Sequence, residues 1–387
     1  MYHTAARGGL LPRVRGPAVV TLHRLAPRLD LSHRFEASYP LHLHPNPTGR
    51  VARLGVAALT AVVVSGCSSN PVDAPPPTIP AAQPADSPAP AARPAGDVRP
   101  LATPVAAAVF DTATTSLLTL SAGPVGRSTI TVFGASGSPR PIELDAAATA
   151  MVTDGAGTAY LARRGGYFRL DIASGEVTAQ AVDGQDDVDF TAITRRADGR
   201  LVLGSADGAV STLSSDTEVG ARLKIFARVD ALAAQGDTAV VLDRGQTSVT
   251  TLNTDGTGAA HALRAGEGAT SIAADGAGRI LVTDTRGGEL LVYGVDPLIL
   301  RQRYPVPDAP YGLAVSADPQ GLAWVAQTAN NTVVGYDLAT GIPVEKVRYP
   351  TVQQPNSLAY DDSSDTLYVA SGSGAGVQVI TAAGGQK

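Results

Sequence analysis

Short apolar runs alternate with turn-forming residues from about residue 97 to the end of the chain. The pattern is clearest between Pro310 and Pro350, where the turns are rich in Gly, Pro, Asp and Asn. The runs there are Gly312–Ser316, Leu322–Gln327, Thr332–Asp337 and the more polar Glu345–Tyr349. Runs of this length with such spacers predict four antiparallel strands joined by hairpins, with the most polar strand outermost.

This four-strand unit recurs seven times. One apolar residue of each first strand recurs at spacings of 42, 42, 39, 40, 41 and 45 residues. These residues are Val109, Met151, Ile193, Leu232, Ile272, Leu313 and Leu358. One such sheet cannot bury both faces alone, whereas neighbouring copies can, and four strands per repeat of about 40 residues is typical of a propeller. We therefore predict an all-β, seven-bladed β-propeller of four-stranded antiparallel blades over residues 97–387. Two packed sheets are the alternative, and the near-equal periods favour the ring.

The two ends of the repeat region complement each other. The last repeat stops after its third strand, at Ile380, and the segment near 97–101 (DVRPL) is similar to the fourth strands of other repeats. We expect this N-terminal segment to supply the missing strand of the last blade. Such a strand would close the ring and remove an open sheet edge.

Residues 1–49 differ from the repeats, because they are rich in Arg and show no clear periodicity. They also carry five of the six histidines, namely His3, His23, His33, His42 and His44. We interpret this segment as an overlong leader or a mis-set translation start, since Val51 is a possible alternative start. A His-rich metal-binding arm is the other interpretation, and the irregular spacing disfavours it.

Residues 50–67 have the order of a lipoprotein signal peptide. Arg50 and Arg53 precede an apolar run, Leu54–Val64, that is too short to span a bilayer and suits a signal-peptide core. The run ends in VSGC, which is similar to a bacterial lipobox, and Cys67 is the only cysteine, so a disulfide within the chain is excluded. We expect lipidation at Cys67 and an extended Pro/Ala-rich tether over residues 68–96, with nothing to bury.

Charge narrows the choice of partners. Without residues 1–66, which hold eight Arg and two acidic residues, the chain keeps 22 basic and 33 acidic residues, a formal net charge of −11. Nucleic-acid binding generally needs a basic surface, so we expect no nucleic-acid partner.

The signal sequence, the tether and the repeats together resemble the LppL-type conserved lipoproteins of mycobacteria, within the wider YVTN/YncE-like group of seven-bladed propellers. The segments that carry the resemblance are Leu223–Leu232 (LKIFARVDAL), Val241–Thr251 (VLDRGQTSVTT), Val292–Arg301 (VYGVDPLILR) and Tyr336–Tyr360 (YDLATGIPVEKVRYPTVQQPNSLAY). The resemblance covers about residues 67–380. It implies a propeller and a place in the cell envelope, but no reaction and no catalytic residues.

Polar residues gather on one predicted face. In a propeller, the loops between blades and the turns between second and third strands share a face, here called the first face. It should carry Arg, Asp, Tyr and Asn around the channel mouth, where binding sites usually lie. The predicted binding residues are Arg163, Arg164, Asp189, Asp230, Arg244, Arg286, Tyr311 and Asn356, and the turn at 327–331 belongs to the same face. Solvated loop tips with local ion pairs are the alternative interpretation. The opposite face carries generic turns such as Asp361-Asp362, for which we expect no function.

Several enzyme classes lack their residues. The one histidine after residue 44 is His261, on an expected outer strand, which disfavours histidine-dependent catalysis in the channel. The single tryptophan, Trp324, disfavours propellers that bind a quinone cofactor and more simply packs between blades. We expect no cofactor and assign no catalytic residue.

The sequence favours an exported, lipid-anchored propeller on the outer face of the cell membrane. It would act as a non-catalytic binding or scaffolding module for an envelope protein or glycan. A hydrolase or lactonase is the first alternative, with a divalent metal held in the channel by Asp189, Asp230 or Asn356. A carrier that binds a small anion through Arg163, Arg244 and Arg286 is the second.

Overall fold

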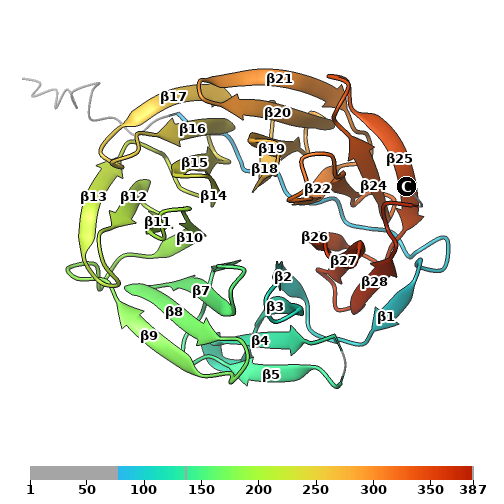
Figure 1. The fold of residues 1–387 in the computed structure, drawn as a ribbon, viewed down its shortest axis with the longest axis horizontal. Coiled ribbons are helices and arrows are strands. Elements are labelled where there is room, and N and C mark those ends of the chain that lie inside the picture. Colours follow the sequence, from blue (N-terminus) through green and yellow to red (C-terminus); the bar gives the residue numbers. More distant parts are fainter. Residues whose placement is uncertain (1–76, 136, 386–387) are drawn as a thin grey trace, which may run out of the picture. The chain divides into compact units, whose positions relative to one another are not determined.

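The protein is described by a computed structural model covering residues 77–135 and 137–385, in which seven blades surround a central axis (Figure 1). The expected leader, the signal peptide and Cys67 lie outside the described residues. The described chain forms 28 strands and one short 3-10 helix, η1 (Pro124–Gly126). The strands make seven four-stranded antiparallel sheets, which confirms the predicted all-β, seven-bladed propeller.

In six of the blades the strands follow one another outwards in chain order, and the seventh combines both ends of the repeat region. Blade 1 contains β2 (Val105–Asp111), β3 (Ser116–Ala122), β4 (Ser128–Phe133) and β5 (Arg140–Glu143). Blade 2 contains β6 (Ala150–Thr153), β7 (Thr158–Arg163), β8 (Gly166–Asp171) and β9 (Val177–Ala181). Blade 3 contains β10 (Phe190–Arg195), β11 (Leu201–Ser205), β12 (Ala209–Leu213) and β13 (Val219–Lys224). Blade 4 contains β14 (Ala231–Gln235), β15 (Thr238–Asp243), β16 (Ser248–Leu252) and β17 (Ala259–Arg264). Blade 5 contains β18 (Ala269–Ala274), β19 (Arg279–Asp284), β20 (Glu289–Val295) and β21 (Leu298–Pro305). Blade 6 contains β22 (Pro310–Val315), β23 (Ala323–Gln327), β24 (Thr332–Asp337) and β25 (Val344–Pro350). Blade 7 contains β26 (Pro355–Asp361), β27 (Thr366–Ser371), β28 (Val377–Thr381) and the N-terminal β1 (Asp97–Arg99).

The core lies between neighbouring blades, as expected for sheets that cannot bury their faces alone. Between blades 1 and 2, for example, Leu118 and Ile130 pack with Leu161 and Phe168. The sole tryptophan, Trp324, is fully buried on β23 and lies 5.8 Å from the ring of Tyr360 on β26. The expectation that it packs between blades is therefore confirmed. The outer strands are polar and exposed, and β17, which carries His261, is one of them.

The ring is closed by the N-terminal strand, as predicted. β1 pairs antiparallel with β28, with Asp97 opposite Val379, Val98 opposite Gln378 and Arg99 opposite Val377. The turn into β1 brings the backbone very close to β28. A Cβ atom placed on Gly96 would lie 2.1 Å from the carbonyl oxygen of Val379, and Gly96 has φ +66. Only glycine meets both demands without strain.

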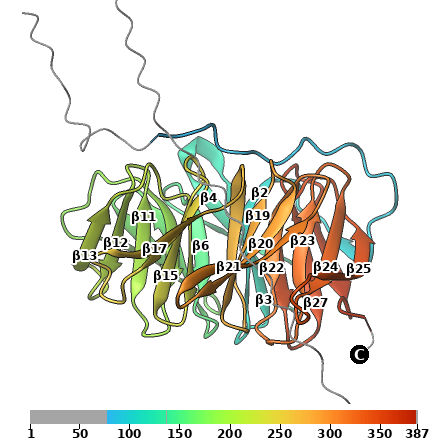
Figure 2. The same ribbon diagram turned by 90° about the horizontal axis from the view of Figure 1, so that it is seen from above.

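Residues 77–96 belong to the segment expected to be an extended tether, and they lie against the propeller. Figure 2 shows this segment extended along one face of the ring before it enters β1. Ala82 within it is buried, so the expectation that the segment has nothing to bury does not hold for residues 77–96. None of the helices described for this chain is long and apolar enough to cross a membrane.

We expect Gly96→Ala to lower the stability of the ring more than Gly155→Ala does. Both glycines have positive φ, but nothing lies within 4 Å of a Cβ atom on Gly155. Gly155→Ala should therefore cost only backbone strain, about 1 kcal/mol, whereas Gly96→Ala should add an overpacking cost of about 1–3 kcal/mol. Denaturant unfolding of both variants measures the difference. Equal losses would show that β1 is not held this closely against β28.

Candidate functional site

The first face is assembled as the sequence analysis expected, because loops between blades contact turns between second and third strands. Arg164, in the turn after β7, reaches the loop before β10, where its guanidinium binds Asp187 at 2.9 Å and Asp189 at 3.0 Å. These hydrogen bonds raise the pKa of Arg164. All three side chains are more than half exposed, so the two ion pairs contribute little to stability.

Arg163 is held differently, although it neighbours Arg164. Its guanidinium donates to the carbonyl oxygen of Arg164 at 3.0 Å and lies 5.2 Å from the ring centroid of Phe168. The distance is within the range of a cation–π interaction. Arg163 therefore supports its own blade, and the exposed charges of this part of the face are those of Arg164, Asp187 and Asp189.

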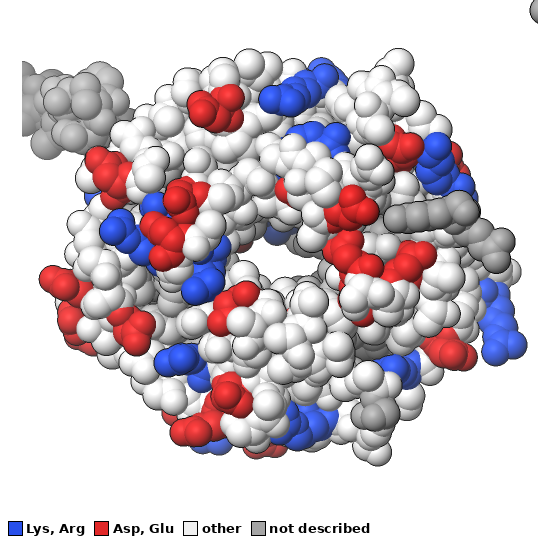
Figure 3. Space-filling model, in the orientation of Figure 1, with Lys and Arg blue, Asp and Glu red and all other residues white. Residues whose placement is uncertain are grey.

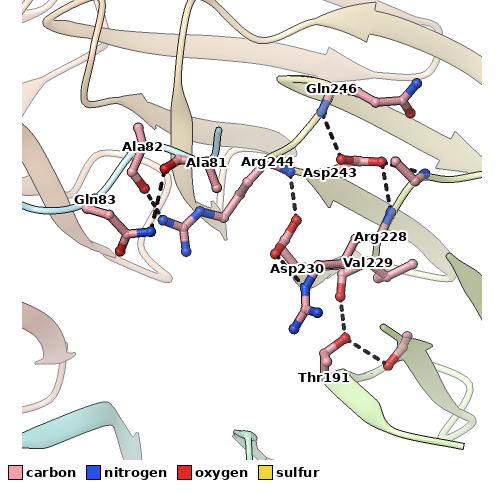
Figure 4. A network of polar contacts seen from close by, with 12 residues as sticks. Ala81, Ala82, Gln83, Thr191, Arg228, Val229, Asp230, Asp243, Arg244 and Gln246 are labelled. Atoms are coloured by element: carbon pink, nitrogen blue, oxygen red, sulfur yellow. Dashed lines mark hydrogen bonds and ion pairs between the residues drawn. The ribbon is translucent and has the colours of Figure 1, made fainter. Parts of the chain in front are cut away.

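On blade 4, carboxylates tie the loops together (Figure 4). Asp230 accepts from the backbone N–H of Arg244 at 2.8 Å and from Nε of Arg228 at 3.0 Å. The buried Asp243 accepts from the backbone N–H groups of Ala227 and Arg228 at 2.9 and 3.2 Å. The guanidinium of Arg244 points away from these carboxylates and donates to the carbonyl oxygen of Ala82.

The eight predicted binding residues do not converge on one constellation. Arg163, Arg164 and Asp189 belong to blades 2 and 3, while Asp230 and Arg244 belong to blade 4. The other three lie farther around the ring. Arg286 follows β19, Tyr311 lies on β22 and Asn356 lies on β26. Asn356 accepts a hydrogen bond from Nε2 of Gln354 at 3.0 Å, and the backbone oxygen of Tyr311 accepts from Oγ1 of Thr283 at 3.0 Å.

Residues 77–95, here called the strap, occupy the first face over blades 4 to 7. At its start, the backbone N–H of Ile79 donates to the carbonyl oxygen of Gly245 at 2.8 Å. Arg286 then donates to the carbonyl oxygen of Pro80 at 2.7 Å. At its end, the N–H of Ala95 donates to the carbonyl oxygen of Pro350 at 3.0 Å. Two predicted binding residues, Arg244 and Arg286, thus hold the chain's own N-terminal segment.

The middle of the strap is bound most densely. Four side chains contact the backbone of residues 85–88, and we call them the strap-binding cluster. They are Thr328 and Asn331, from the turn after β23, and Gln353 and Gln354, from the loop before β26. Thr328 and Asn331 are buried beneath the strap, which makes this part of the face an assembled contact rather than a loose covering.

The opposite face holds a cavity of about 730 Å³ between blades 6 and 7. Its lining includes Leu322, Lys346, Tyr360, Asp362 and Asp365. Asp365 accepts from the hydroxyl of Tyr360 at 2.6 Å, and burial together with this hydrogen bond raises the pKa of Tyr360. Figure 3 shows acidic side chains beside the central opening, over the position of β26 in Figure 1. A cavity of this size on the face expected to carry only generic turns was missed by the sequence analysis.

The expected alternative of a carboxylate metal site finds little support in the geometry. Asp189 is paired with Arg164, and Asp230 is already bonded to Arg228 and to the backbone of Arg244. Among residues 77–135 and 137–385, no group of three or more His, Cys, Asp or Glu side chains is arranged to hold a metal ion. In this arrangement, the carboxylates of Asp189 and Asp230 are thus bound by arginine side chains and, for Asp230, by a backbone N–H group.

The seven four-stranded sheets define a seven-bladed β-propeller. Comparison with known proteins agrees with this fold and identifies the family. The chain belongs to the family described as SMP-30/Gluconolactonase/LRE-like region, which matches residues 124–373. This family differs from the YVTN/YncE-like group that the sequence analysis expected. No curated protein sequence matches the chain.

Solved structures of similar fold come from different enzymes. A streptogramin B lyase structure has a TM-score of 0.60 and 10% identity, and the match covers 75% of this chain and 97% of that one. A catalytically inactive histidine-to-alanine variant of virginiamycin B lyase from Staphylococcus aureus, with quinupristin, has a TM-score of 0.61 and 11% identity, covering 74% and 98%. Hydrazine synthase of Kuenenia stuttgartiensis has a TM-score of 0.59 and 13% identity, covering 75% and 98%. At such identities the likeness concerns the fold alone.

We expect amide hydrogen exchange to be slow at Ile79, Ala85 and Ser87, because these N–H groups donate to the propeller. Gln354→Ala should speed exchange at Ser87 most, because that N–H donates to Oε1 of Gln354. Exposed Ala91 and Ala92 serve as internal references for fast exchange. Fast exchange at all three strap positions in the unmodified chain would contradict the docked arrangement.

Proposed function

We propose that this chain is an exported, lipid-anchored propeller of the LppL type. It acts as a non-catalytic binding or scaffolding module on the outer face of the cell membrane. The observation that carries the proposal is the docking of the strap onto the first face, because the strap is the part of the described chain that lies nearest to Cys67 in sequence.

The docked strap brings the first face near the anchor. Residue 77, where the described chain begins, follows Cys67 by ten positions. Because an extended chain spans at most about 3.3–3.6 Å per residue, this residue would stay within about 35 Å of a lipidated Cys67. At that distance from the membrane, a neighbouring envelope protein or glycan is the partner that we propose for the first face.

The part of the face over blades 2 and 3 offers charged groups for such a partner. Arg164, Asp187 and Asp189 are exposed there, whereas the strap is bound by blades 4 to 7. Exposed charges at the rim of an interface mainly speed association and select the partner, and they add little to the affinity. The net charge of −11 after residue 66 supports a partner other than nucleic acid.

A lactonase-like enzyme is the second candidate, and the family description, which includes gluconolactonase, favours it. The loops of the first face support an enzymatic function less than the family description does. The candidate metal ligands Asp189 and Asp230 are already in ion pairs, and His261 lies exposed on the outer strand β17. The third candidate, an anion carrier, would need Arg244 and Arg286, which donate to carbonyl oxygens of the strap.

A crosslinking pull-down from intact envelopes tests the binding function. We expect the unmodified chain to capture a discrete partner, and the variant Arg164→Glu to capture about tenfold less, since a reversed charge repels a complementary surface. The matched control is Arg301→Glu on the outer strand β21, which changes the charge equally at another exposed arginine and should capture normally.

Equal capture by Arg164→Glu and by the control variant would show that this part of the first face is ordinary surface. In that case a lactone-hydrolysis assay with and without Ca²⁺ decides for the second candidate. Turnover that is lost on chelation and in Asp230→Asn would replace the binding proposal with an enzymatic one.

The anchor is tested separately. We expect Cys67→Ala to abolish lipid labelling and to move the protein from the membrane to the soluble fraction, because stable membrane attachment would depend on the acyl chains at Cys67. Cys67→Ser is the closest substitution in size and should behave in the same way. Continued lipid labelling of either variant would remove Cys67 from the proposal.

A further inference from the structure

The strap-binding cluster has the features of a peptide-binding site rather than of a linker contact. Gln354 uses both ends of its side-chain amide on one stretch of backbone. Its Nε2 donates to the carbonyl oxygen of Ala85 at 2.9 Å, and its Oε1 accepts from the N–H of Ser87 at 3.0 Å. A carbonyl and an N–H two residues apart form the pair that a neighbouring parallel strand would bind. The glutamine amide thus takes the place of a peptide group, as in strand addition.

The neighbouring side chains complete the recognition of the same stretch. The hydroxyl of Thr328 accepts from the N–H of Ala85 at 3.0 Å. Gln353 donates to the carbonyl oxygen of Ser87 at 2.9 Å, and Asn331 donates to that of Pro88 at 2.7 Å. In each of these hydrogen bonds the strap contributes a backbone N–H or carbonyl group, and none of them involves a side chain of the strap. The cluster therefore recognises an extended backbone.

Side-chain contacts then favour small residues. The hydroxyl of Ser87 donates to the carbonyl oxygen of Thr328 at 2.5 Å. Ala82 is buried against Gly268, where a Cβ atom on the glycine would lie only 2.9 Å from that of Ala82. Prolines suit such a site, because they restrict the backbone before binding and bring no N–H that must be satisfied.

The cluster is fixed by the propeller itself and not by the strap. Gln354 and Asn331 both have left-handed backbones, with φ of 57 and 55, which residues other than glycine rarely adopt. The carbonyl oxygen of Gln354 accepts from the N–H groups of Asn356 and Gly372 at 2.8 and 2.7 Å. Oδ1 of Asn331 accepts from the N–H of Gln354 at 3.1 Å. These contacts are made within the propeller, so the strap is not needed to form them.

We propose that the strap-binding cluster is a binding site for extended, proline- and alanine-rich polypeptide segments with a small hydroxyl residue before a proline, and that residues 85–88 occupy it as an intramolecular ligand. This inference rests on the proposed function, in which the first face is the binding surface. A segment of the same chemistry on a partner would compete with the strap. Because the strap is tethered, its effective concentration is in the millimolar range, so the partner's segment binds well only when the strap is displaced.

The test uses the full chain and a fluorescein-labelled synthetic peptide of residues 77–91, followed by fluorescence anisotropy. The strap is weakened by Ala82→Asp and Ser87→Asp, which place charges at a buried and a hydrogen-bonded position and leave the cluster unchanged. We expect the peptide to bind this strap-weakened chain at least about tenfold more tightly than the unmodified chain, since the competing segment is lost.

Two further substitutions in the strap-weakened chain test the recognition. Gln354→Ala should weaken peptide binding about tenfold, because two backbone hydrogen bonds are lost. Gln302→Ala, on the outer strand β21, is the matched control and should leave peptide binding unchanged. Circular dichroism spectra that match the unmodified chain establish that the variants are folded.

The outcomes separate this proposal from the proposed function. Absence of peptide binding to the folded, strap-weakened chain overturns the peptide site, and so does binding that Gln354→Ala leaves unchanged. If the peptide does not bind, but the unmodified chain captures a partner that Arg164→Glu does not capture, the proposed function stands and the peptide site is overturned. Peptide binding without an envelope partner would support the site and remove the partner assigned to blades 2 and 3.

Discussion

The whole ring depends on one short pairing, between β1 and β28. Three residue pairs complete the seventh sheet, and without them the outer edge of β28 would be open to pair with another chain. The close approach at Gly96 shows how little space the pairing leaves. The contact also seals the packing between the last and the first blade, where Val377 and Ala370 meet Leu117 and Val105.

The segment before β1 extends this closure across the first face. The strap and β1 are continuous in sequence, and Gln378 of β28 donates to the carbonyl oxygen of Ala95 where one leads into the other. The arginines of the face are correspondingly structural on blades 4 and 5, where Arg244 and Arg286 hold carbonyl oxygens. On blades 2 and 3, Arg164 stays exposed in a local network with aspartates. One face therefore has a covered part and an open part, each with its own chemistry.

Much of the fold was predictable because each blade repeats a pattern of local signals. The expected strand Thr332–Asp337 is β24 itself, and the expected strand Leu322–Gln327 is β23 with one residue fewer. The burial of Trp324 and the closing strand also followed from the sequence. The strap did not, because its binding comes from side chains more than 240 positions away, such as Thr328 and Gln354. From its composition, the strap was expected to have no core of its own. It has none, but it is bound to the surface of the propeller, where Ala82 becomes buried.

The candidate site was predictable only in part for a related reason. The sequence identified the face, including the turn that contains Thr328 and Asn331, since loop positions follow from the order of strands. It favoured charged residues there, whereas the densest contacts are made by uncharged amides and hydroxyls. The cavity beside Asp362 and Asp365 was missed because its lining comes from turns of two blades and from the C-terminal segment, which no local pattern connects.

The position of β1 also sets the order in which the chain can fold. Val98 pairs with Gln378, which is 280 positions later in the sequence. Contacts of such separation form slowly, because a long loop must close before they stabilise anything. The strand β1 is therefore synthesised long before its partner strand β28. Blades 1 to 6 can form one after another, but the circle cannot close until β28 is present, so closure of the ring is the last step that the order of the strands allows.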